Sequence, residues 1–272
     1  MLNLAPVLEA AKDKIIAVAW YDFETGADYF LNADYEFHPA STFKVHVMME
    51  VFRQAQAGSL SLEDCLPILN SFTSIADGTS YSLDINDDSE KTLYARIGES
   101  ETIDELTRLM IVRSSNLATN ILLEKVGTKN VNDFIQWLGI QGVTVRRGVE
   151  DNVAFRLGMN NSATARGLTQ TMKLIAGKKV VSEAASEKMI EILLGQEFNE
   201  SIPALLPKSV RVAHKTGWTG DVYHDTGIVY PEREGRQPYA LSIMTKGFAE
   251  DHEQEAHQCM ATISRLIYEQ MQ

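Results

Sequence analysis

The sequence has only two cysteines, Cys65 and Cys259, and lacks any clustered set of metal ligands. The cysteines do not have metal-ligand spacing, and the six histidines include no His-Glu-x-x-His motif. Cys259 lies on the apolar side of the last expected helix, where a cysteine behaves as a small buried side chain. We therefore expect no Cys65–Cys259 disulfide, no metal site and no cofactor.

Two motifs of common enzyme classes are also absent. The sequence contains no Gly-x-Gly-x-x-Gly or other phosphate-binding loop, which argues against a nucleotide cofactor. It contains no Gly-x-Ser-x-Gly elbow, which argues against an α/β-hydrolase triad.

The sequence has fewer basic than acidic residues, and it lacks long apolar runs. The formal net charge is −12, which disfavours binding to nucleic acids and to anionic membrane surfaces. No segment of about 18 apolar residues exists, and Glu9, Lys12 and Asp13 interrupt the place of a signal-peptide core. We expect a monomer that spans no membrane. As written it would be cytoplasmic, or periplasmic or secreted if a signal peptide has been removed.

The periodicity of apolar residues predicts strands at both ends of the chain and helices in the middle. We expect strands at 15–21, 27–32, 210–216, 223–230 and 239–246, the first two forming a hairpin. We expect helices at 42–57, 102–112, 117–126, 131–138, 164–176, 183–194 and 256–271, with irregular segments at 67–100 and 144–163.

This order of elements predicts an α/β fold of the α+β type. An antiparallel sheet formed from both termini, flanked by helices and carrying an all-helical insert, accommodates it without long unpaired edges. We expect a single domain over 1–272, with an α/β subdomain of residues 1–40 and 205–272 and a helical subdomain of residues 41–204.

Ser41 and Lys44 begin the most apolar of the expected helices. Residues three apart project from the same side of a helix, so the lysine can act on the serine hydroxyl. A lysine serves as a base if burial or a second cation lowers its pKa. A Ser-x-x-Lys pattern occurs about once by chance in a chain of this size, so the motif alone does not establish a site.

Two later motifs carry similar chemistry. Ser114-Ser115-Asn116 follows a helix and offers a hydroxyl and an amide, although helix capping alone explains these residue types. Lys215-Thr216-Gly217 lies on a late strand. A lysine in an apolar strand indicates a bound anion, or else an edge strand that resists aggregation.

Together, STFK at 41–44, SSNLATN at 114–120 and KTG at 215–217 resemble the motif set of class A β-lactamases and penicillin-binding proteins. The resemblance extends over nearly the whole chain and implies the fold described above. It also implies that Ser41 is the acylated nucleophile, that Lys44 is its base or proton relay, and that Ser114 passes the proton to the leaving nitrogen.

The same resemblance implies which residues bind the substrate and its oxyanion. Asn116 would bind the substrate's side-chain amide, and Lys215 and Thr216 its carboxylate. The backbone N–H groups of Ser41 and Trp218 would form the oxyanion hole.

The resemblance further implies a glutamate that activates the deacylating water, and Glu150 is the candidate, with Asp151 beside it. The usual Glu-Pro-x-Leu-Asn run is missing here. An ion pair of Glu150 with Arg146 or Arg147 is the open alternative.

Other positions depart from the family pattern. Ser115 replaces an aspartate, Trp218 replaces a small residue, and His224 stands where many members have an arginine.

Three functions follow as hypotheses. The first is a β-lactamase that acts through an acyl-enzyme on Ser41. The second is a serine esterase or D,D-peptidase with the same nucleophile. The third is a catalytically silent binding relative, against which the intact motif residues argue.

Overall fold

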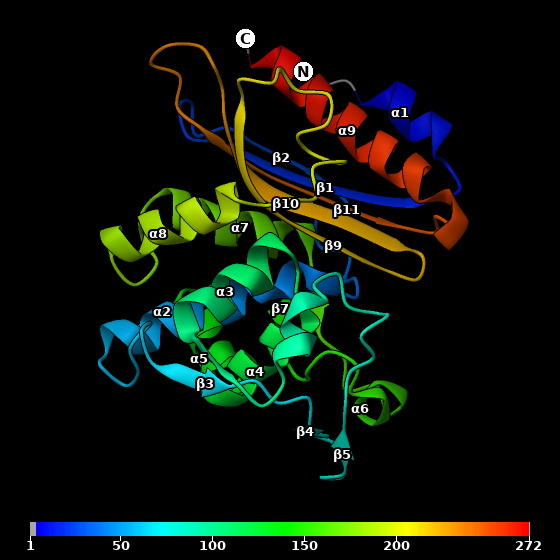
Figure 1. Cartoon of the computed structure of the whole chain (residues 1–272). Coiled ribbons are helices and arrows are strands. Elements are labelled where there is room, and N and C mark those ends of the chain that lie inside the picture. The colour runs from blue at the N-terminus through cyan, green and yellow to red at the C-terminus, as the bar shows by residue number, and fades with distance from the viewer. Residues whose placement is uncertain (1–3, 272) are drawn as a thin grey trace.

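The computed structural model describes residues 4–271 and contains a five-stranded antiparallel sheet formed from both ends of the chain (Figure 1). The strand order is β2-β1-β11-β10-β9. The strands are β1 (Ile15–Asp22), β2 (Asp28–Leu31), β9 (Arg211–Thr219), β10 (Val222–Tyr230) and β11 (Tyr239–Lys246). The expected α+β fold with an antiparallel sheet flanked by helices is therefore confirmed.

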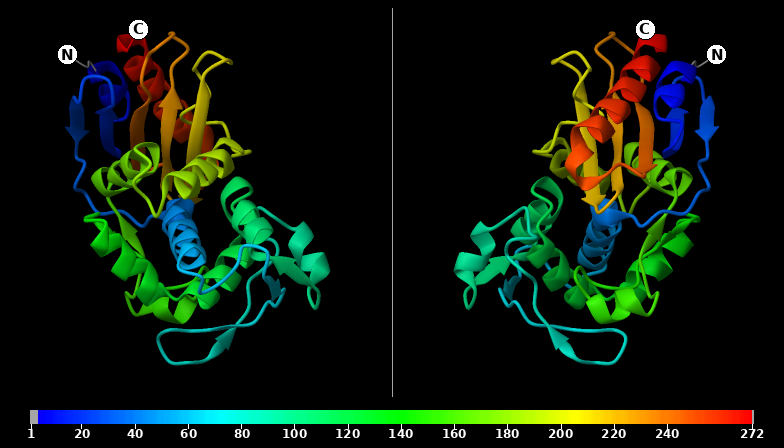
Figure 2. Two further views of the ribbon diagram at one scale, coloured as in Figure 1. Left: turned by 90° about the vertical axis from the view of Figure 1, so that its left-hand side faces the viewer. Right: turned by 90° about the vertical axis from the view of Figure 1, so that its right-hand side faces the viewer.

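Helices cover both faces of this sheet (Figures 1 and 2). The helices α1 (Ala5–Ala10) and α9 (Glu253–Gln270) lie on one face, and α7 (Ala165–Ala176) lies on the other. Strand β1 shows why both faces are covered. Its side chains alternate between the two cores, with Ile16 and Val18 in the core under α9, and Ala17 and Ala19 in the core that includes α7.

A group of helices continues from the α7 face. It contains the 3-10 turn η1 (Ala40–Phe43) and the helices α2 (Lys44–Gln56), α3 (Ile103–Val112), α4 (Asn116–Val126), α5 (Thr128–Trp137) and α8 (Glu183–Leu194). Every residue of α2 from Lys44 to Phe52 is buried, as its nearly uniform apolar pattern predicts. Helices α7 and α8 contact the sheet, and α8 also contacts α2 and α3, so the subdomain boundary at residue 204 stays a prediction.

The two segments without clear periodicity form short elements. The first contains β3 (Cys65–Pro67), β4 (Phe72–Thr73), β5 (Ser80–Tyr81), η2 (Thr92–Arg96) and β6 (Ser100–Thr102). The second contains β7 (Val143–Thr144), α6 (Asn152–Arg156) and β8 (Ser162–Ala163), and η3 (Glu250–His252) precedes α9. The β4–β5 hairpin extends away from the body of the molecule (Figure 2).

The cysteines agree with expectation, since Cys65 is exposed, Cys259 is buried and both are free thiols. Within residues 4–271, no helix combines the length and the apolar character that crossing a membrane requires.

Candidate active site

Ser41 lies in η1, immediately before α2, and is pressed against strand β9. A Cβ atom added to Gly217 would lie 2.6 Å from the Ser41 backbone nitrogen and 3.0 Å from that of Thr42. Only glycine permits so close an approach of the two backbones. Strand β9 is an edge strand of the sheet, and Gly217 brings its backbone next to that of Ser41.

Lys44, the first residue of α2, is fully buried and points to the beginning of α4. Its Nζ donates hydrogen bonds to the Ser114 carbonyl oxygen at 2.7 Å and to Asn116 Oδ1 at 2.8 Å, and it lies 3.4 Å from Ser114 Oγ. Burial lowers the pKa of Lys44 to about 7, although the charges of Asp88 and Glu150 act in the opposite direction. Near neutral pH this amine can therefore exchange a proton with a neighbouring hydroxyl.

Lys215 approaches the same serine from β9. Its fully buried Nζ donates to Ser114 Oγ at 3.0 Å and to the Thr216 carbonyl oxygen at 2.8 Å. Burial, and then repulsion by Lys44, hold the pKa of Lys215 well below its usual value. The Ser114 hydroxyl thus contacts both lysines, and it is held by a backbone with φ of +57°, which is rare outside glycine.

Asn116 begins α4, and a distant carboxylate caps the backbone there. Asp88 Oδ2 accepts hydrogen bonds from the backbone N–H groups of Asn116 and Leu117, both at 2.9 Å, and from the Tyr94 hydroxyl at 3.0 Å. Sequence reasoning missed this buried aspartate. It lies 28 residues before Asn116 in an aperiodic segment, so no local capping pattern reveals it.

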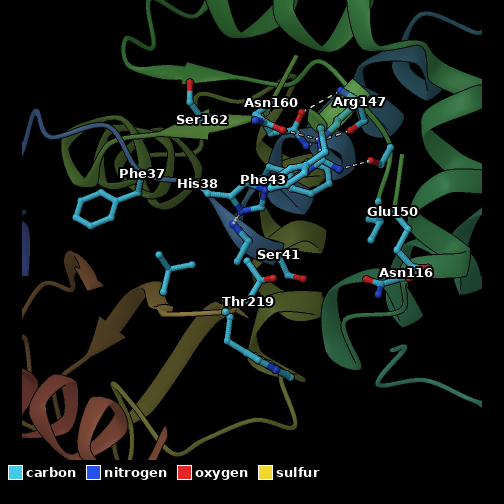
Figure 3. A pocket seen from close by; sticks show the side chains of 18 of the residues that line it. Phe37, His38, Ser41, Phe43, Asn116, Arg147, Glu150, Asn160, Ser162 and Thr219 are labelled. Carbon is cyan, nitrogen blue, oxygen red and sulfur yellow. Dashed lines mark hydrogen bonds between the residues drawn. The ribbon is translucent and has the colours of Figure 1, made fainter. Parts of the chain in front are cut away.

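A cavity of about 1110 Å³ lies in front of this cluster (Figure 3). Five of the eight predicted site residues line it, namely Ser41, Ser114, Asn116, Glu150 and Trp218. The other three, Lys44, Lys215 and Thr216, are buried. The Thr216 hydroxyl oxygen has no hydrogen-bond partner within residues 4–271.

Glu150 also reaches the cavity, from a loop with a left-handed backbone of φ +59°. Its Oε2 accepts a hydrogen bond from the Asp84 backbone N–H at 2.9 Å, whereas its Oε1 is buried without a partner in the described chain. Burial is the main cause that raises the pKa of Glu150, and nearby aspartates add to it. Among the ion pairs of residues 4–271 none joins Glu150 to Arg146 or Arg147, so the salt-bridge alternative is wrong.

Asp151, directly next to Glu150, has a structural environment. Its carboxylate accepts hydrogen bonds from Ser74 Oγ at 2.7 Å and from the backbone N–H groups of Ile75 and Ala154, both at 3.0 Å. It therefore caps α6 and ties this loop to the β4 region.

The three departures from the family pattern have structural counterparts. Ser115 accepts a hydrogen bond from the Ala118 backbone N–H and caps α4. Trp218 is 39% exposed and packs edge-on against Phe198, so it forms part of the cavity rim. His224 is buried, and burial lowers its pKa to about 4, so it is neutral near pH 7 and supplies no cation in place of the arginine.

Nothing in the described part of the chain groups three or more His, Cys, Asp or Glu side chains in a way that could hold a metal ion. The chemistry available at the cavity is that of a serine hydroxyl, two amines of lowered pKa, an amide and a carboxyl group.

Several known proteins are similar to this chain over most of its length. Beta-lactamase CARB-4 of Pseudomonas aeruginosa is 22% identical over 243 residues, which cover 88% of this chain and 79% of that protein. The crystal structure of a beta-lactamase from Chitinophaga pinensis superimposes with a TM-score of 0.82 at 22% identity, covering 98% of both chains. The structure of PBP-A has a TM-score of 0.80 at 21% identity and covers 98% of this chain and 96% of its own.

These two structural similarities establish the fold. The model of the beta-lactamase enzyme family matches residues 3–271. Because that match takes in the serine, both lysines and every cavity-lining residue described above, this chain belongs to the beta-lactamase enzyme family.

Proposed function

We propose that this protein hydrolyses β-lactam amides through an acyl-enzyme on Ser41. The observation that carries the proposal is the Lys44–Ser114–Lys215 hydrogen-bond chain, whose Ser114 lines the same cavity as Ser41. Two amines of lowered pKa share one hydroxyl, and such an arrangement can move a proton from the nucleophile to the leaving group of an acyl transfer.

In the acylation step the neutral Lys44 amine takes the proton of Ser41 Oγ. The oxygen attacks the lactam carbonyl carbon, and the backbone N–H groups of Ser41 and Trp218 stabilise the oxyanion. The C–N bond of the ring then breaks, and Ser114 delivers a proton to the leaving nitrogen. Ser114 then recovers a proton from Lys44, so the ester forms without net release of a proton.

In the deacylation step Glu150 takes a proton from a water molecule that attacks the ester. Its raised pKa supports this role, since a base is most efficient when its pKa approaches the working pH. Hydrolysis of the ester returns the proton to Ser41.

Substrate binding uses the remaining residues. The Asn116 side chain lies at the cavity wall, where it binds an amide of the substrate. The unpartnered Thr216 hydroxyl and the Lys215 Nζ supply donors for a carboxylate on the β9 side. Trp218 shapes the rim. A mutant of the similar protein PBP-A has been solved as an acyl-enzyme complex with penicillin-G, which supports a β-lactam as the ligand class.

A D,D-peptidase or esterase with the same nucleophile is the second candidate. The environment of Glu150 favours it, because the Asp84 N–H already occupies one oxygen of the carboxylate. An enzyme whose glutamate cannot position water would acylate quickly and deacylate slowly.

The test follows nitrocefin turnover together with intact-protein mass after a brief exposure to benzylpenicillin. We expect turnover and one acyl group on the peptide that contains Ser41. Ser41→Ala should lose both, whereas Ser162→Ala, which alters another serine of the cavity wall, should keep both. A persistent adduct without turnover selects the second candidate. An adduct that survives in Ser41→Ala contradicts the assignment of the nucleophile.

A further inference from the structure

Arg147 is a buried cation without an acidic partner. Its residue is only 7% exposed, and none of the ion pairs within residues 4–271 includes it. Its Nε donates to Asn160 Oδ1 at 3.1 Å and its Nη1 to the Gly148 carbonyl oxygen at 3.1 Å, and its guanidinium lies over the Phe155 ring. Buried guanidinium groups are ordinarily paired with an anion, because removing a charge from water is costly.

The carboxylate beside it is engaged elsewhere. Asp151 contributes favourable charge at longer range, but its oxygens bind Ser74 and two backbone N–H groups. Burial lowers the pKa of Arg147, which reflects the incomplete compensation of its charge. The loop thus carries a positive charge that no side chain of the described protein neutralises at contact distance.

The contact between Arg147 and His38 lacks a hydrogen-bond acceptor. Arg147 Nη2 lies 3.2 Å from His38 Nε2, and the Ala40 backbone N–H donates to His38 Nδ1 at 3.2 Å. Burial, and then the Arg147 charge, lower the pKa of His38 to about 4, so the ring is neutral near pH 7. A neutral imidazole has one acceptor nitrogen. While Nδ1 accepts from Ala40, Nε2 carries a proton, and two donors face each other with no acceptor between them.

These two donors lie on the cavity that contains the nucleophile. Arg147, His38 and Asn160 line it together with Ser41, and in Figure 3 Ser41 lies between Thr219 of β9 and the Arg147 side chain. A group bound at Arg147 is therefore separate from the carboxylate assigned to β9. It lies on the opposite side of Ser41, where the acyl side chain of a β-lactam would lie when its ring carboxylate is held at β9.

We propose that Arg147 and the Nε2–H of His38 bind a carboxylate on the acyl side chain of the substrate, an inference that rests on the function proposed above. A carboxylate would accept hydrogen bonds from both donors and neutralise the guanidinium. The favoured substrate class is then β-lactams or related acyl compounds with a second negative charge on the acyl side. The protein would select them despite its net charge of −12.

Carbenicillin and benzylpenicillin are suitable probes, because they differ by one carboxylate on the acyl side chain. Binding of each to the non-acylating Ser41→Ala protein is measured by calorimetry. We expect carbenicillin to bind about tenfold more tightly, as a charge-assisted hydrogen bond predicts. Adding Arg147→Gln should abolish this preference and leave benzylpenicillin binding nearly unchanged, and Arg147→Lys should keep part of it.

The matched control is Arg156→Gln, which removes the same charge from an exposed residue of the same loop that does not line the cavity. The protein with Arg156→Gln should keep the preference for carbenicillin. Equal binding of the two penicillins, or a preference that persists in Arg147→Gln, overturns the proposal. If Arg147→Gln does not fold, the comparison of the two penicillins and the Arg147→Lys variant still decide the matter. Failure of the wild-type protein to acylate Ser41 contradicts the proposed function alone, since this binding measurement does not require acylation.

Discussion

The two sides of the cavity are built differently. On one side, Lys44 comes from α2, Ser114 from the α3–α4 junction and Lys215 from β9. All three are buried, and both lysines contact the Ser114 hydroxyl. On the other side, Glu150 and Arg147 come from a loop and keep donors or acceptors without partners in the described chain. The first side is therefore preorganised for proton transfer, whereas the second has polar groups left for water and substrate.

Replacing the base should have the largest effect on the preorganised side. We expect Lys44→Arg to lower the acylation rate by about 10²–10⁴, because a guanidinium keeps the charge and cannot accept a proton. Stopped-flow measurement of the nitrocefin burst gives this rate. A rate within about twofold of wild type would show that Lys44 is not the base.

A change on the loop side should affect a different step. We expect Glu150→Gln to acylate at close to the normal rate and then to deacylate about 10²–10³ times more slowly. The measurement is a burst of one equivalent followed by a slow steady state. Asp151→Asn is the control for deacylation because its carboxylate binds Ser74, Ile75 and Ala154. If only the Asp151→Asn protein deacylates slowly, Asp151 rather than Glu150 activates the water.

The pH dependence of the burst rate reports on Lys44 and therefore on the preorganised side of the cavity. The pKa of Lys44 is lowered to about 7, and its neutral form is the base. The burst rate should therefore be maximal above pH 7 and fall about tenfold for each unit below it, or about 100-fold by pH 5. A burst rate independent of pH between 5 and 8 would show that no group with this pKa controls acylation.

A smaller effect should follow from enlarging Gly217. The added Cβ of Gly217→Ala would lie 2.6 Å from the Ser41 nitrogen, so η1 and β9 must separate slightly. We expect kcat/KM to fall about tenfold through a widened oxyanion site, since removing one donor entirely costs about 10²–10³. The temperature of thermal unfolding should fall as well, because the added Cβ meets backbone atoms of Ser41 and Thr42. An unchanged kcat/KM would show that this close approach does not position the oxyanion donors.

Much of the fold was predictable because periodicity is a local property. The five strands of the sheet and all seven expected helices lie within three residues of their predicted ranges, and α5 and α9 each begin three residues earlier than expected. The six-residue helix α1 was not predicted, since it is too short to establish a periodic pattern. The small elements of the two aperiodic segments were missed for the same reason.

The residues that could carry acyl-transfer chemistry can be read from the sequence, because Ser41 and Lys44 are neighbours on one helical turn and the later motifs have recognisable residue types. How these residues meet depends on the packing of distant segments. Lys215 and Ser114 lie 101 residues apart and form a 3.0 Å contact, Asp88 caps a helix that starts 28 residues later, and Glu150 binds Asp84 rather than an arginine. The reason is physical: hydrogen-bond partners and desolvation depend on which distant segments pack together, and both are set by the fold as a whole.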